Sequence, residues 1–432
     1  MTAIARIVFY FMRGGGIVPR AILLALLALA LKLPLSLVSD IVTDRQSYES
    51  EAVKNVTGAW GQSQTLLGPM VRVPYSTTDG RHRTVTLLPD KLTINGKLAP
   101  QQRRRGLFDV TVYAAALDVV AEFPVKSIRD VPSDGRVIDW SSATLGVGLS
   151  DEKSIDAGTV EIDGQTVEWA AEIPTPLLSL KAPLGAVPLD RRDTITVRFR
   201  LTFGGSTSFA VAPVGWRTEV SLESPWPSVS FIGRYLPMAQ STDDTGFKAR
   251  WVVPPLGRGY GQLWDGVDDS SATMLARSAL GVALINPVDA YRETDRAIKY
   301  AVMLIGLTFA ACLLFELAID ARPSFAQYGL IGLSLCVFYL LLLSFAERIG
   351  FAPAYLASAS AVVAQATVYN WFLSRRWLLA AAFAATLTFL YAGLYTLLQL
   401  EEASLLSGSL VLFAVLSLAM WLTRNLHRER PA

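Results

Sequence analysis

The sequence predicts an α+β membrane protein with six transmembrane helices, one N-terminal and five C-terminal, and a large antiparallel, sandwich-like all-β domain. Three observations lead to this fold class. Residues 300–369 hold three apolar runs separated only by DARPS and ERIG, another apolar run lies near the N-terminus, and the sequence between them alternates with a period of two. Because about 20 apolar residues cross the ~30 Å hydrocarbon core of a bilayer, these runs predict tightly connected membrane helices.

The composition indicates that a polar part and a membrane part are separate in the chain. Hydrophobic residues make up 52% and the mean hydropathy is +0.37, a modest excess over the ~45–50% of ordinary soluble domains. Residues 40–299 hold 28 basic and 31 acidic residues, so this part is nearly neutral and predicts no nucleic-acid partner. Both cysteines, Cys312 and Cys336, lie in apolar runs, which excludes a disulfide or a cysteine zinc site in the polar part.

The first element expected is an uncleaved signal anchor. Arginines precede the apolar run 21–38, which is longer than a signal-peptide core, is interrupted by Lys32 and Pro34, and lacks a small-x-small cleavage site. We therefore assign 1–39 to a cytoplasmic N-terminus and anchor helix. Apolar residues then recur at helical spacing, which predicts an amphipathic helix over 40–66.

Residues 67–299 are expected to form the β-rich domain. Their alternating segments are punctuated by four pairs that favour two-residue hairpin turns. These pairs are Asp79-Gly80, Asn95-Gly96, Asp134-Gly135 and Asp163-Gly164. The pattern predicts antiparallel strands in a sandwich and leaves open whether there are one or two sandwiches.

Residues 300–423 are expected to form the five-helix bundle, because apolar runs over 377–400 and 405–423 add two spans to the first three. The tail 424–432 is basic. Arginines gather in the loops that would share one side of the membrane with both termini: Arg6, Arg13, Arg20, Arg322, Arg375, Arg376, Arg424, Arg428 and Arg430. By the positive-inside rule both termini are cytoplasmic. For a bacterial source, the protein is then a multi-pass inner-membrane protein with residues 40–299 in the periplasm.

The sequence contains no complete catalytic motif. His82 and His427 lie on opposite sides of the expected membrane, which excludes a two-histidine metal site. The S-x-x-K pattern at Ser150–Lys153 lacks the S-D-N and K-T-G elements that accompany it in penicillin-recognising enzymes. We therefore expect no enzyme activity, no cofactor, and no catalytic or metal-binding residue.

The candidate intramembrane polar residues are Glu316, Gln327, Tyr339 and Glu347. A charged carboxylate within a span costs roughly 2.5–3.5 kcal/mol, so Glu316 is expected to find a partner or to lie at the interface. It could form a structural hydrogen bond between helices, or take part in a proton relay or substrate path. The run Arg103, Arg104, Arg105 is the candidate periplasmic contact: either a solvated turn, or a contact with lipid phosphates or an acidic partner.

Several sequence blocks resemble the CreD family of bacterial inner-membrane proteins. They are RRRGLFDVTVY from Arg103, GPMVRVPY from Gly68, LESPWP from Leu222, GFKARW from Gly246, and the stretch from Val288 through Phe338 to Glu347. Arg348 stands where the family pattern has a histidine, so no role of that histidine carries over. The resemblance implies a part in cell-envelope integrity, through an envelope-stress regulon, colicin tolerance and responses to β-lactams, and it supplies no catalytic residue.

Two hypotheses follow. In the first, a non-enzymatic protein held in the lipid bilayer uses its periplasmic domain to bind an envelope protein or a cell-wall component. In the alternative, Glu316 and the intramembrane amides serve a transporter or flippase of an envelope lipid or cell-wall intermediate. The oligomeric state stays open.

Overall fold

The structure is a computed structural model that describes residues 17–130, 136–152, 155–175, 178–266, 269–285, 290–319 and 324–399, and the single positions 409, 413 and 417. The chain divides into two compact units. Met1–Glu49 and Val288–Ala432 form the helical unit, and Ser50–Pro287 form the β unit. One helix, α3 (Lys32–Trp60), contributes residues to both.

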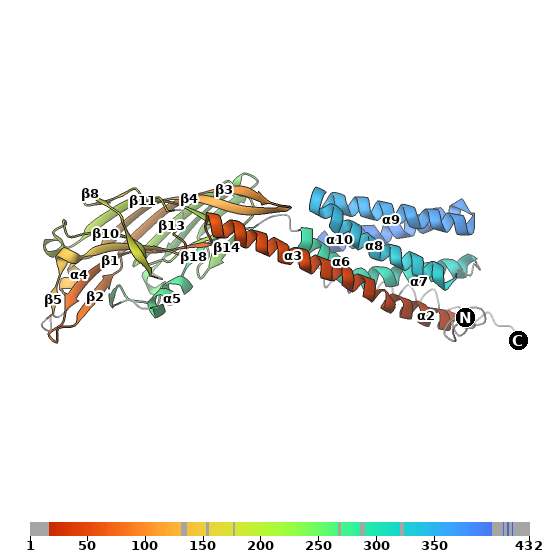
Figure 1. Cartoon of the computed structure of the whole chain (residues 1–432), viewed down its shortest axis with the longest axis horizontal. Coiled ribbons are helices and arrows are strands. Elements are labelled where there is room, and N and C mark those ends of the chain that lie inside the picture. Colours follow the sequence, from red (N-terminus) through yellow and green to blue (C-terminus); the bar gives the residue numbers. More distant parts are fainter. Residues whose placement is uncertain are drawn as a thin grey trace. The chain divides into compact units, whose positions relative to one another are not determined.

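The β unit contains two sheets whose inner faces share one hydrophobic core (Figure 1). Its strands are β1 (Gln64–Ser76), β2 (His82–Leu87), β3 (Lys91–Arg105), β4 (Phe108–Phe123), β5 (Val137–Ile138), β6 (Thr144–Leu149), β7 (Thr159–Ile162), β8 (Gln165–Glu168), β9 (Ala170–Thr175), β10 (Leu178–Pro183), β11 (Ile195–Ser206), β12 (Ser208–Val211), β13 (Arg217–Ser224), β14 (Val229–Gly233), β15 (Ala239–Asp243), β16 (Gly246–Val253), β17 (Leu263–Asp265) and β18 (Leu280–Leu284). Short helices α4 (Lys126–Arg129) and α5 (Asp269–Arg277) and the 3-10 turns η1 (Trp140–Ser142), η2 (Leu189–Arg191) and η3 (Pro255–Gly257) connect them.

The ten-stranded sheet has the order β14-β18-β12-β1-β6-β10-β9, with β2 and β5 pairing with β1 and β17 pairing with β2. The eight-stranded sheet has the order β15-β16-β13-β3-β4-β11-β7-β8. Burial alternates residue by residue along the first eight residues of β3 and of β11, as expected for strands with one face on a core and one in water. Trp251, Tyr113 and Phe209 are among the largest fully buried side chains, so the two inner faces form a sandwich-like core.

The prediction of a purely antiparallel domain is wrong for two strand pairs. β1 pairs with β12, and β3 pairs with β13, in parallel. Parallel neighbours need a long crossover between them, so they leave no hairpin signal in the local sequence.

The predicted turns had different outcomes. Asp163-Gly164 forms the two-residue turn between β7 and β8, with both residues at positive φ, and Asp79-Gly80 lies in the β1–β2 hairpin. The prediction at Asn95-Gly96 is wrong, because both residues lie inside β3. A Cβ at Gly96 would lie 2.6 Å from Leu222 Cδ2, so this glycine makes room for packing from the next strand. Asp134-Gly135 lies outside the described residues.

The predicted amphipathic helix over 40–66 is part of α3, which ends at Trp60, and β1 already begins at Gln64. Gly61 has a φ of +144°, and a Cβ there would lie 2.7 Å from the carbonyl oxygen of Gly204. The close approach of two backbones ends the helix at this point, several residues before the predicted boundary.

The helical unit contains α2 (Ile17–Ala30), the first part of α3, α6 (Ala290–Lys299), α7 (Ala301–Ile319), α8 (Phe325–Ile349), α9 (Phe351–Ser374) and α10 (Trp377–Gln399). Among the described residues, four helices are long and apolar enough to cross a membrane: Ile22–Trp60, Phe325–Ile349, Phe351–Leu373 and Trp377–Gln399. A fifth candidate is the pair Tyr291–Lys299 and Ala301–Leu313, which is bent by 46°. The sixth predicted span, 405–423, and the tail 424–432 lie outside the described residues apart from three single positions.

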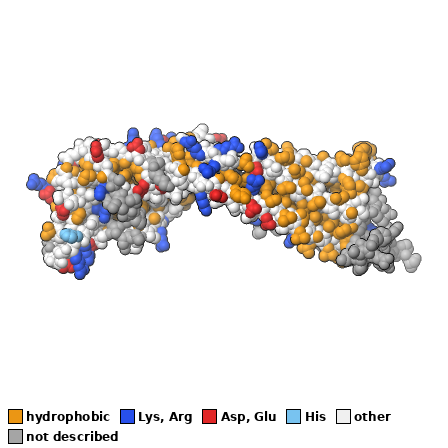
Figure 2. Space-filling view, viewed as in Figure 1, with side chains coloured by type: hydrophobic (Ala, Val, Ile, Leu, Met, Phe, Trp, Pro, Cys, Tyr) orange, Lys and Arg blue, Asp and Glu red, His pale blue; other side chains and the backbone are white. Residues whose placement is uncertain are grey.

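Large hydrophobic side chains are exposed on the helices of this unit, and Figure 2 shows them gathered over its visible face. Leu33 is 72% exposed on α3, Leu356 is 69% exposed on α9 and Phe389 is 77% exposed on α10. Exposed apolar surface of this extent is what a lipid-facing helix requires.

Candidate functional site

Two adjoining hollows of about 480 and 590 Å³ lie on the outward face of the eight-stranded sheet. Both are lined by β3, β13, β15 and β16, and they share Lys97, Glu223, Ser241 and Lys248. We call the two hollows together the polar trough. Other polar side chains that line it are Asn95, Asp118, Ser221, Gln240, Asp243, Thr245 and Arg250.

Strand register brings the charges of the trough together. The parallel pairing of β3 with β13 sets Lys97 beside Glu223, and the antiparallel pairing of β13 with β16 sets Lys248 on the other side of Glu223. Lys97 Nζ lies 2.8 Å from Glu223 Oε1. The hydrogen bond from Lys97 lowers the pKa of Glu223, and the same bond raises the pKa of Lys97.

Two further ion pairs border the trough. Arg250 Nη2 lies 2.9 Å from Glu219 Oε2, and Arg200 Nε lies 2.7 Å from Asp118 Oδ1. The hydrogen bonds from these arginines lower the pKa of Glu219 and of Asp118. All three carboxylates are therefore ionised at neutral pH.

The lining of the trough has the composition of a polar binding surface. Its cations and anions alternate across neighbouring strands, and hydroxyl and amide groups lie between them. In the residues that the structure describes, no group of three or more His, Cys, Asp or Glu side chains could hold a metal ion. His82 is the exposed first residue of β2, with Nδ1 3.0 Å from the hydroxyl of Ser76. A polar ligand that carries both charges matches this surface.

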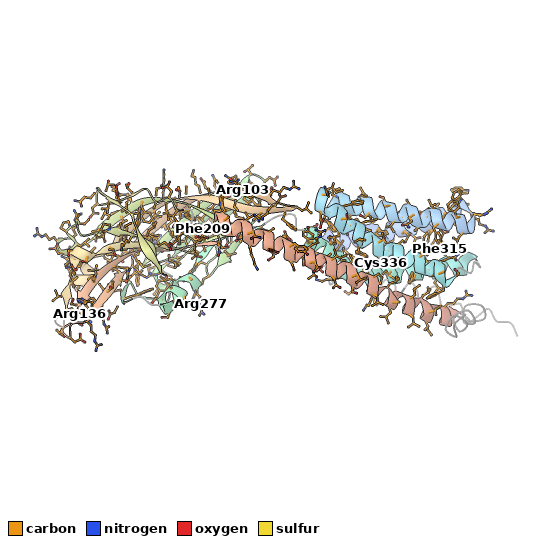
Figure 3. All side chains as sticks on the ribbon, in the orientation of Figure 1. Arg103, Arg136, Phe209, Arg277, Phe315 and Cys336 are labelled. Carbon is orange, nitrogen blue, oxygen red and sulfur yellow. The ribbon has the colours of Figure 1, made fainter. Side chains whose placement is uncertain are left out.

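The predicted arginine run lies at the end of a long hairpin. Arg103, Arg104 and Arg105 are the last residues of β3, and they pair with the first residues of β4 across the turn at Gly106 (Figure 3). The guanidinium of Arg103 lies 4.6 Å from the ring centroid of Trp60, the last residue of α3. Trp60 Nε1 in turn donates to the carbonyl oxygen of Tyr113 at 3.2 Å. All three arginines are exposed, and Arg103 in addition has a packing partner.

The predicted intramembrane residues do not form one site. Glu316 lies in α7, and its side chain is outside what the structure describes. Gln327, Tyr339 and Glu347 all lie on α8, but a rise of 1.5 Å per residue separates the first two by roughly 18 Å and the last two by roughly 12 Å. Each of the three therefore has a different set of neighbours.

Gln327 has a local structural partner at the start of α8. Its Oε1 accepts a hydrogen bond from the backbone N–H of Ser324 at 2.7 Å, as in a capping box. This contact satisfies a donor that the first turn of the helix would leave unpaired.

Tyr339 lies in a cluster of aromatic residues at the centre of the bundle. Phe338 packs against the rings of Tyr339, Tyr355 and Tyr391 with centroid separations of 4.8 to 5.4 Å. Tyr355 donates to the carbonyl oxygen of Tyr391 at 2.7 Å. Within the described part of the chain, the buried hydroxyls of Tyr339 and Tyr391 have no hydrogen-bond partner.

Glu347 joins three helices. Its Oε1 lies 3.4 Å from Arg45 Nε of α3 and accepts a hydrogen bond from the hydroxyl of Tyr291 of α6 at 3.1 Å. The Glu347 side chain is 12% exposed and that of Arg45 is 41% exposed. The carboxylate is therefore a contact point of the helical unit close to the polar end of α8.

Lys97, Glu223 and Lys248 were missed by reasoning from the sequence. Each sits in an ordinary alternating strand, and only the long-range register brings them together. A signal was present in the alternation itself, since it places these residues on the polar face, but nothing in it gives the partner strand.

These features define a multi-pass membrane protein that carries a β-sandwich-like domain. A family model described as "Inner membrane protein CreD" matches residues 17–428. The chain therefore belongs to the CreD family of inner-membrane proteins, as the sequence blocks indicated.

A curated relative is the inner membrane protein CreD of Escherichia coli (strain K12), which is 28% identical over 412 residues. The match covers 92% of this chain and 90% of that protein. Among solved structures, yeast LTA4 hydrolase in complex with bestatin matches with a TM-score of 0.21 and 11% identity, over 51% of this chain and 35% of the hydrolase. The chain thus spans about a third of the length of the hydrolase, and a likeness this weak carries no argument about fold or function.

Proposed function

We infer that this chain is a non-enzymatic protein of cell-envelope integrity and the envelope-stress response. In this proposal the β unit faces the periplasm and binds an envelope protein or a cell-wall component through the polar trough, while the helical unit anchors the protein in the inner membrane. The observation that carries the proposal is the trough itself, because its charges of both signs, amides and hydroxyls match a polar ligand better than any reaction.

Lys248 is the strongest candidate for a direct ligand contact. Its antiparallel partner Glu223 already forms an ion pair with Lys97, and among the described residues Lys248 makes no direct ion pair and acts on Glu223 and Asp243 only through space. A cation left in this state can bind an anionic group of a ligand, and the neighbouring carboxylates can bind a cationic one.

The binding proposal can be tested by photo-crosslinking in living cells. A photo-reactive amino acid at position 241 lies in the trough, and the same residue at position 277, on exposed α5, is the matched control. We expect a crosslinked product at 241 only, with a yield that falls several-fold in Lys97→Glu and Lys248→Glu. Equal products at both positions, or a yield insensitive to both charge reversals, would contradict the proposal.

The topology proposal needs its own test, because the trough must lie outside the cytoplasm. The support for this topology is the excess of arginine in the loops assigned to the cytoplasm. Alkaline phosphatase fused after residue 150 should be active, and the same enzyme fused after residue 322 should be inactive. The reverse pattern would place the β unit in the cytoplasm.

The transporter alternative depends on Glu316. If Glu316→Gln abolishes an envelope phenotype that Lys97→Glu and Lys248→Glu leave intact, the result favours the transporter alternative over the binding proposal. If Glu316→Gln has no effect, the alternative loses its main support.

A further inference from the structure

A second, separate cavity of about 240 Å³ lies in the β unit where β1, β2, β5, β17 and α4 meet. One side of it is apolar. Its apolar lining residues are Val85, Ile128, Ile138, Leu263 and Trp264. The volume lies below the ~300–1,000 Å³ of sites for drug-sized ligands, so the cavity can take only a small molecule.

Most of the charged groups around this cavity are already paired. Asp265 accepts a hydrogen bond from the hydroxyl of Tyr75 at 2.6 Å and forms an ion pair with Arg83 at 3.0 Å. Arg129 donates to the carbonyl oxygens of Asp190 and Arg192 and pairs with Asp193 at 2.6 Å. Asp265 and Arg129 therefore need no ligand to pair with their charges.

Arg136 is the exception. It lines the cavity directly before β5, and its guanidinium lies 5.2 Å from the ring centroid of Tyr75 (Figure 3). Within the described part of the chain it makes no direct ion pair, although its charge acts through space on Asp265 of the same cavity. Stacking on Tyr75 holds the planar guanidinium at the cavity while its N–H donors stay available.

We propose that this cavity binds a small carboxylate with an apolar body, such as an aryl carboxylate, and that Arg136 pairs with its carboxylate. The apolar lining accepts the body of the ligand, and the guanidinium of Arg136, which makes no direct ion pair, supplies the cation for its carboxylate. An arginine binds a carboxylate through two parallel N–H···O bonds, so the ligand's orientation is fixed as well. The site shares no lining residue with the polar trough and does not depend on it.

The proposal is tested with the full chain in nanodiscs of zwitterionic lipid, using 2-naphthoate as the probe and 2-naphthamide as its neutral counterpart. Calorimetric titration, corrected with empty nanodiscs, should show naphthoate binding that is about tenfold or more tighter than naphthamide binding. Arg136→Gln should remove that preference, and the matched variant Arg104→Gln, an exposed arginine outside the cavity, should keep it.

Val85→Phe is the second variant, because it fills the cavity without touching the charge. It should abolish naphthoate binding while Arg136 is still present. Absence of naphthoate binding to the unaltered chain, equal binding of the two probes, or binding that survives both Arg136→Gln and Val85→Phe would overturn the proposal.

Discussion

In the β unit, charged side chains lie on the outward face of a sheet and pair across strands, whereas in the helical unit the buried polar groups lie among aromatic rings inside the bundle. Glu223 and Lys97 illustrate the first arrangement, and Tyr339 and Tyr391 the second. The sheet keeps its charges in contact with water, so they remain available to a ligand at little cost. In the helical unit, the buried hydroxyls of Tyr339 and Tyr391 have no hydrogen-bond partner among the described residues, whereas that of Tyr355 joins two helices, α9 and α10.

The two units also differ in what surrounds their glycines. In the sheets, some glycines allow one backbone to approach another: a Cβ at Gly281 of β18 would lie 2.1 Å from the carbonyl oxygen of Phe209. In the helical unit, a Cβ at Gly332 of α8 would lie 2.3 Å from Leu31 Cδ1 and 2.9 Å from Phe309 Cζ, which are the ends of two side chains. Backbone atoms held in a hydrogen-bonded strand pair cannot move away from an added Cβ, whereas the end of a side chain can shift to another position.

The largest effect is therefore expected from Gly281→Ala. Overpacking against backbone should destabilise the β unit by about 3 kcal/mol, whereas Gly332→Ala should cost the helical unit about 1 kcal/mol. Denaturant unfolding in detergent, followed by near-ultraviolet circular dichroism, measures both.

Gly306→Ala is the matched control, because nothing lies within 4 Å of a Cβ at that position in α7. It should be neutral or slightly stabilising, since alanine favours helix more than glycine does. If Gly332→Ala lowered the free energy of unfolding as much as Gly281→Ala, the packing of the helical unit would be as unable to adjust as that of the sheet.

A smaller effect is expected from Glu347→Gln in the helical unit. The change removes the ion pair with Arg45 and replaces a charged acceptor of the Tyr291 hydrogen bond by a neutral one. We expect a loss of about 1–2 kcal/mol, measured by thermal unfolding in nanodiscs. Asp295→Asn, which breaks the exposed pair with Lys299 on α6, is the control and should change stability far less. Equal losses would mean that Glu347 is as well solvated as a surface carboxylate.

The same comparison explains which features could be read from the sequence. Spans such as α8 and α10 were predictable because their length and apolar content are local properties. The turn at Asp163-Gly164 was predictable for the same reason. The polar trough was not, because the parallel pairing of β3 with β13 joins segments far apart in the chain. The wrong prediction of a turn at Asn95-Gly96 has the same origin, since the glycine is needed there to make room for Leu222 of the distant strand β13.

Acid should weaken the β unit. Cationic partners lower the pKa values of Glu219, Glu223 and Asp118, so these carboxylates stabilise the fold fully above their ordinary pKa values of 4.5 for glutamate and 3.8 for aspartate. That contribution is lost as the pH falls below this range through the lowered values. Each carboxylate is at least partly exposed to water, so the loss per group is about 0.2–1 kcal/mol.

Unfolding midpoints measured from pH 6 down to pH 3 test whether the stability of the β unit falls with falling pH. Glu223→Gln should flatten the pH dependence slightly, and Glu168→Gln, an exposed glutamate outside the trough, should leave it unchanged. A β unit that gained stability below pH 4 would contradict the assignment.

The smallest effect is expected where α3 meets the β3–β4 hairpin within the β unit. Arg103→Ala removes the cation–π contact with Trp60 and should cost about 0.5 kcal/mol, because the contact is at an exposed position. Arg104→Ala removes an equal charge without that contact and should be neutral. The difference between the two variants, measured by denaturant unfolding, separates the charge from the ring contact and from the hydrogen bond that Arg103 donates to Gln101 Oε1 at 3.3 Å. If both cost the same, the run acts through its charge alone, and the hypothesis of a lipid-phosphate or acidic-partner contact gains over that of a packing residue.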